Sequence, residues 1–105
     1  MAEQPWSFFP VGAQMSEIIG ADIASAATIA PSRLIHRVTG TTAIVNITVP
    51  WVGFAGMLVL IPTAIWTWTA AGNIITAGTV TAGNGVPVLF FYNPDTVKWS
   101  PSRLT

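Results

Sequence analysis

Residues 44–68 read IVNITVPWVGFAGMLVLIPTAIWTW, and this stretch decides the fold. It is the most apolar part of a long segment, from Arg37 to Asp95, whose interior holds no Lys, Arg, Asp or Glu. Two interpretations are open. Either the stretch crosses a membrane as a helix, or it supplies the paired core strands of a small β-domain.

The helical interpretation is disfavoured by interruptions in the apolar run. Residues 49–66 are uncharged over about the length that a membrane-spanning helix needs. However, Pro50 and Pro62 each lack a backbone donor, and Gly53 and Gly56 weaken a helix between them. No cluster of Lys or Arg marks a cytoplasmic side. The sequence therefore favours strands, and we expect no membrane partner.

Strand patterns explain the same stretch better. Residues 57–61 form a short apolar run that Pro62 ends, which is typical of a strand buried on both faces. Residues 65–69 alternate, so we predict that Trp66 and Trp68 lie on one face of a strand.

Four aromatic residues of this stretch are candidates for the core or for a subunit interface. Trp51 and Phe54 lie in a corner over residues 50–56, and Trp66 and Trp68 lie in the following strand. Stacking of such rings on sugars is an alternative, but a sugar site also needs several polar side chains, of which this surface offers few. Core or interface packing is the favoured interpretation.

The rest of the chain repeats the strand pattern between turn signals. Further strands are predicted at residues 21–29, 34–39, 42–49, 73–81, 86–92 and 96–100. We expect one hairpin to join 34–39 with 42–49, and a second at Asn84-Gly85, which is the strongest hairpin signal in the chain. Residues 93–95 form a further turn. This spacing predicts an all-β fold, a small antiparallel sandwich or barrel of jelly-roll type.

The first twenty residues differ from this pattern. Trp6, Phe8 and Phe9 lie between Pro5 and Pro10, and the prolines disfavour a helix or a central strand. We predict an extended N-terminal arm over residues 1–20 that docks outside its own domain through the three aromatic anchors. A disordered terminus is the alternative. Residues 21–105 then form a single β-domain.

Composition narrows the class of function. Only 8% of the residues are charged, and the formal net charge is zero. The composition therefore argues against nucleic acid as a partner, because binding it needs a basic face. A soluble monomer is also disfavoured, because its uncovered apolar surface would be large. The chain has no cysteine, so it holds no disulfide.

The sequence offers no recognisable catalytic set. His36 is the only histidine, and a catalytic histidine needs a nucleophile and an orienting carboxylate. The carboxylates are far apart in the sequence: Glu3, Glu17, Asp22 and Asp95. A metal site would need two or three His or Cys ligands. We therefore expect a structural or interface histidine, no enzyme activity, no metal and no cofactor.

The order of several motifs resembles a known module. The motifs are IHRVTGTTAI at residues 35–44, Pro50, GFAG at 53–56, LIP at 60–62, AGNI at 71–74 and KWSPS at 98–102. This order is similar to a β-module of tailed-bacteriophage virion proteins, found in head-fibre and head-decoration proteins and commonly trimeric. The resemblance covers about the last two thirds of the chain and carries no catalytic residues.

The resemblance implies a structural virion protein. We expect a homotrimeric decoration or cement protein on the phage capsid surface, with the major capsid protein as its partner. The alternative is a receptor- or glycan-binding phage fibre or tail module. A small membrane protein is the third hypothesis.

Overall fold

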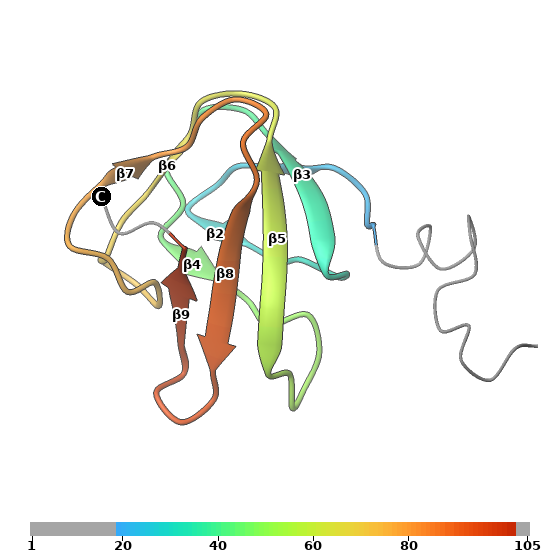
Figure 1. Ribbon diagram of the computed structural model, residues 1–105, viewed down its shortest axis with the longest axis vertical. Coiled ribbons are helices and arrows are strands. Elements are labelled where there is room, and N and C mark those ends of the chain that lie inside the picture. The colour runs from blue at the N-terminus through green and yellow to red at the C-terminus, as the bar shows by residue number, and fades with distance from the viewer. Residues whose placement is uncertain (1–18, 103–105) are drawn as a thin grey trace, which may run out of the picture.

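The computed structural model describes residues 19–102, and this part of the chain is all-β, which confirms the predicted fold class (Figure 1). Its strands are β1 (Ile23–Ala24), β2 (Thr28–Ile29), β3 (Ile35–Thr39), β4 (Asn46–Ile47), β5 (Gly56–Pro62), β6 (Thr67–Trp68), β7 (Val80–Thr81), β8 (Val88–Asn93) and β9 (Lys98–Pro101). No helix long and apolar enough to cross a membrane occurs between residues 19 and 102.

The main layer is a five-stranded sheet in the order β1-β3-β5-β8-β9. The strands β5, β8 and β9 are antiparallel neighbours, and the turn predicted at residues 93–95 joins the last two as a hairpin. In contrast, β3 is parallel to both β1 and β5. The sequence predicted an antiparallel arrangement, whereas this sheet is mixed, with both parallel and antiparallel pairs.

A second layer covers the inner face of this sheet. It contains the parallel pair β2-β4 and the antiparallel pair β6-β7, and Figure 1 shows the β2–β3 connection passing behind β5 and β8. Ile44 bridges Trp68, which links the two small pairs. Apolar side chains on the facing sides of the two layers are hidden from water.

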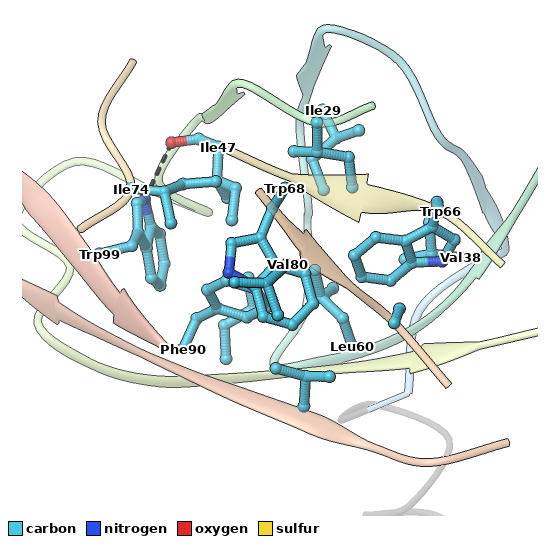
Figure 2. Packing of buried hydrophobic residues seen from close by; sticks show 14 of the residues in the cluster. Ile29, Val38, Ile47, Leu60, Trp66, Trp68, Ile74, Val80, Phe90 and Trp99 are labelled. Carbon is cyan, nitrogen blue, oxygen red and sulfur yellow. Dashed lines mark hydrogen bonds between the residues drawn. The ribbon is translucent and has the colours of Figure 1, made fainter. Parts of the chain in front are cut away.

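The core between the layers is rich in aromatic side chains (Figure 2). Trp66 and Trp68 are both fully buried, and their ring centroids are 5.8 Å apart, which confirms that they share a face. Phe90 from β8 packs against Trp68 at 5.4 Å in an edge-on arrangement. Large rings that contact one another in this way bury much apolar area in a small domain.

Neither predicted hairpin forms. Strand β4 pairs with β2 instead of β3, because the chain crosses to the other layer after Thr39. At Asn84-Gly85 the turn exists, with Gly85 at a φ of 78° and its N–H donated to the Pro62 carbonyl at 2.7 Å. The flanking strands nevertheless belong to different sheets, since β7 pairs with β6 and β8 pairs with β5.

Two predicted strands are also modified. Most of residues 73–81 is irregular, and only β7 and an isolated bridge from Ile74 to Trp99 are regular. The run at residues 57–61 is indeed a central strand, but one of its faces is open to solvent, because Met57 is 47% exposed. No described element covers that side of β5.

Polar side chains fix the irregular segment to its neighbours. Asn73 accepts a hydrogen bond from the N–H of Ile47 at 2.9 Å and donates its amide to the Ile47 carbonyl at 2.8 Å. The side chain of Asn46 in turn accepts from the N–H of Asn73 at 3.1 Å. The side chain of Asn73 thus bonds the N–H and the carbonyl of Ile47 in β4, as a neighbouring strand would do.

Candidate interaction surfaces

The described residues contain no site with the features of a catalytic or metal centre. No pocket occurs in residues 19–102, nor does any group of three or more His, Asp or Glu able to hold a metal ion. Oδ1 of Asp22 lies 3.7 Å from Nη1 of Arg37, and both side chains are more than half exposed. Asp95 lies in the exposed β8–β9 turn, where the side chain of Asn93 accepts its N–H at 2.9 Å. The carboxylates of Asp22 and Asp95 therefore lie in different parts of the surface and do not form a pair.

His36 is buried, and both of its ring nitrogens form hydrogen bonds with backbone groups. Its Nδ1–H donates to the carbonyl of Ala21 at 2.7 Å, and its Nε2 accepts the N–H groups of Ser32 and Arg33 at 3.0 and 2.9 Å. These acceptors and donors define the neutral tautomer with the proton on Nδ1. The imidazole therefore ties the start of the described chain and the turn before β3 to that strand.

The predicted core or interface aromatics separate into two groups. Trp66, Trp68 and Phe54 are buried in the core, with Phe54 packed against Trp99 at 5.7 Å. Trp51 is 51% exposed, and its ring packs against Phe54 in a T-shaped arrangement with centroids 5.0 Å apart. Trp51 is therefore the member of the four that remains able to contact a partner.

Trp51 belongs to a tight turn with an apolar tip. The N–H of Phe54 bonds to the carbonyl of Trp51 at 3.2 Å, and Gly53 has a φ of 83°. Positive φ at the third residue of such a turn favours glycine. The turn presents Val52 to solvent with 97% of its surface exposed. An apolar pair at the tip of a constrained turn is a candidate contact for another protein.

The outer face of the main sheet is a second apolar surface. At the centre of this side of the sheet, apolar side chains alternate with core residues along β3, β5 and β8. We call this group the outer apolar face, and its members are Ile35, Met57, Val59, Ile61, Leu89 and Phe91. Met57 lies directly opposite Phe91, and Val59 lies opposite Leu89. Phe91 is 52% exposed. The sequence pattern located these strands but did not show that this side stays uncovered.

Polar residues border the outer apolar face on both sides. Arg37 and Asp22 lie beside it toward β1, and Lys98 and Ser100 lie on β9 at the opposite margin. The centre itself carries no charge. An apolar centre with a polar rim is the usual anatomy of a surface that contacts protein.

The predicted arm anchors lie outside the described residues. Trp6, Phe8 and Phe9 precede residue 19, where the described chain begins. Ile19 forms a parallel bridge with Ile35, and the N–H of Gly20 bonds to the Ile35 carbonyl at 2.8 Å. These last two residues of the predicted arm therefore belong to the edge of the main sheet.

No protein-family model, curated protein or solved structure matches this chain. Its surfaces are therefore interpreted from their own chemistry. The described residues offer two exposed apolar surfaces, a buried histidine bonded to backbone groups, and carboxylates that lie apart from one another.

Proposed function

We propose that this protein is a structural component of a phage virion, a decoration or cement protein that binds the outside of the capsid as a homotrimer. The exposed apolar surface of a small, sparsely charged β-domain carries the proposal. Among residues 19–102, nine large apolar residues are at least 39% exposed, and the whole chain has only four basic and four acidic residues. Such a surface favours permanent burial in an assembly.

The mechanism in this proposal is mechanical. Aromatic packing between two layers gives a rigid body, with the Trp66 and Trp68 rings at its centre. A rigid body that contacts neighbouring capsid subunits restrains their relative movement without doing chemistry. Association with the major capsid protein adds binding free energy to the folded, assembled state.

Contacts between the three copies use exposed apolar residues of the turn over residues 51–54, outside the outer apolar face. Trp51 and Val52 at the tip of their turn are the strongest candidates, because a rigid aromatic residue beside an aliphatic one can fill a pocket on a partner. Closed symmetry would bury these residues in every copy at once.

Contact with the capsid uses the N-terminal arm in this proposal. Trp6, Phe8 and Phe9 are the anchors, and Pro5 and Pro10 restrict the arm so that docking costs less entropy. Each aromatic side chain contributes about 1.5–3 kcal/mol when it is fully buried, before ordering costs. Three arms on one trimer would strengthen attachment through their raised effective concentration.

The alternative of a glycan-binding fibre module has less support. Trp66, Trp68 and Trp99 are buried in the core, so their rings are closed to a sugar. Among the tryptophans that the structure describes, Trp51 alone offers an exposed ring, and Val52 beside it offers no polar group for hydroxyls.

Co-sedimentation with capsids tests the proposal. Capsids of the phage that carries this chain, stripped of it, are mixed with the purified full-length protein and pelleted. We expect saturable binding that changes little between low and high salt, because the contact is apolar. A chain with Trp6, Phe8 and Phe9 all changed to Ala should lose binding.

Two controls keep the result interpretable. Deletion of residues 1–18 leaves Ile19 and Gly20 paired with β3, so the truncated chain should fold and still fail to bind capsids. Failure of the wild-type protein to bind, together with its absence from purified virions by mass spectrometry, would overturn the proposed function. Glycan-array binding through Trp51 would instead support the fibre alternative.

A further inference from the structure

The outer apolar face needs a covering partner, and its size limits what that partner is. Three strands spaced by about 4.8 Å and five residues of about 3.3 Å each give a footprint of roughly 240 Å². Two such faces stacked against each other would bury only about 500 Å², whereas specific interfaces bury roughly 1,200–2,000 Å². A second copy of this face is therefore too small a partner.

An extended segment with a few large side chains fits a footprint of this size. A buried aromatic residue covers about 150–250 Å², so two or three are enough to cover the face. The first eighteen residues of this chain contain such a group, Trp6, Phe8 and Phe9, and only two charged residues, Glu3 and Glu17. Their composition matches the uncharged centre of the face.

The described chain begins beside this face. Ile19 is level with Ile35, which is itself level with Val59 on β5. Because the segment at Ile19 runs parallel to β3, its N-terminal end faces the next row of the outer apolar face, where Met57 and Phe91 lie opposite each other. The N-terminal segment therefore enters the sheet at the edge next to the apolar rows.

The chain outside the described residues is long enough to reach across. From the segment at Ile19 to β8 is three strand spacings, or about 14 Å, which about five extended residues span. Phe9 lies ten residues before Ile19 and Trp6 lies thirteen before it. The slack allows a turn between the edge of the sheet and the aromatic group.

We propose that residues 1–18 lie across the outer apolar face of their own chain, with Trp6, Phe8 and Phe9 packed against Met57, Leu89 and Phe91. This inference extends the proposed function, because the arm that binds the capsid is held on its own sheet before assembly. Holding the anchors there keeps them from associating with other copies in solution. Capsid binding then requires the arm to leave the face.

Cysteine cross-linking of the full-length protein tests this placement, since the chain has no cysteine of its own. Ser7→Cys puts a thiol between the anchors, and Ser100→Cys puts one on β9 directly opposite Phe91. We expect an intrachain disulfide under mild oxidation. The matched pair, Ser7→Cys with the exposed Thr81→Cys on β7, should form it about tenfold more slowly. Equal rates, or a disulfide mainly between chains, would overturn the proposal.

Hydrogen exchange supplies a second measurement that does not depend on a cross-link. Phe91→Thr removes the ring and keeps a residue suited to a strand. We expect amide protection over residues 6–9 to fall about tenfold, which is within the effect of losing one partly buried aromatic contact. Val86→Thr, at a similarly exposed site away from the face, should leave that protection unchanged. Unchanged protection in Phe91→Thr would contradict the proposal.

Capsid binding separates this inference from the proposed function. The Phe91→Thr protein should still bind capsids, because its arm is released and its anchors are intact. If the amides of the arm are unprotected in the wild type and in every variant, and the wild type still binds capsids, then the proposed docking of the arm on its own sheet is wrong. The proposed capsid function then stands. If the arm is docked and no variant binds capsids, the function is wrong and the docking stands.

Discussion

Trp99 donates its indole N–H to the carbonyl of Ile47 at 2.9 Å, and this bond joins two residues 52 positions apart (Figure 2). It connects β9 in the main sheet to β4 in the second layer, where both groups are buried. The ring of Trp99 also packs against Tyr92, with centroids 4.9 Å apart. One side chain therefore supplies apolar packing within a layer and a polar link between layers.

The Trp99→Phe variant should be less stable than Trp66→Phe by about 1–2 kcal/mol in the free energy of unfolding. Both substitutions remove the same atoms from a fully buried side chain. They differ because Trp99 loses a buried hydrogen bond, whereas Nε1 of Trp66 has no hydrogen-bond partner in the described structure. Urea denaturation followed by far-UV circular dichroism, at one protein concentration, gives the difference. Equal destabilisation would show that the bond contributes nothing.

The Asn73→Ala variant should lose about 1–3 kcal/mol of stability. The substitution leaves the N–H of Ile47 without its acceptor and removes one of the two donors to the Ile47 carbonyl. Asn84→Ala at an exposed turn is the matched control and should change stability by less than about 0.5 kcal/mol. Thermal unfolding midpoints of the two variants would contradict this expectation if they matched.

The Gly20→Ala variant should be destabilised by about 1–3 kcal/mol through overpacking. A Cβ at this position overlaps the ring of His36, which three hydrogen bonds to backbone groups hold in place. At Gly78 a Cβ meets nothing within 4 Å, so Gly78→Ala should be neutral or stabilising by up to about 1 kcal/mol. Calorimetry of both proteins tests the contrast, and a Gly20→Ala protein as stable as wild type would show that the ring can move.

The wild-type protein should sediment as a trimer, at three times the 11.1 kDa of one chain. The variant with Trp51→Ser and Val52→Ser should dissociate to folded monomers, because these exposed residues are proposed to fill the contacts between copies. Sedimentation equilibrium over a range of micromolar concentrations measures both. Ile65→Ser, at another exposed apolar site, is the control for a general effect of surface polarity. A monomeric wild type would refute the trimer itself.

Features that depend on neighbouring residues could be predicted from the sequence. The alternation in residues 65–69 placed Trp66 and Trp68 on one face, because successive side chains of a strand point to opposite sides. The Pro62 boundary of β5 and the turn before β9 followed from local backbone chemistry in the same way. The sparse charge also predicts partners for this surface, and that stays a prediction.

Pairing and exposure were decided only by the tertiary structure. The turn at Asn84-Gly85 was predicted, but its strands pair in different sheets, because pairing depends on long-range packing that a turn signal does not contain. His36 became a backbone clamp only when Ala21 and the turn at Ser32 came together around it. Likewise, successive side chains of β5 point to opposite faces of the sheet, but this pattern does not show which face another layer covers. The second layer fills one side of β5 and leaves Met57 and Phe91 on the other, and that asymmetry creates the candidate binding surface.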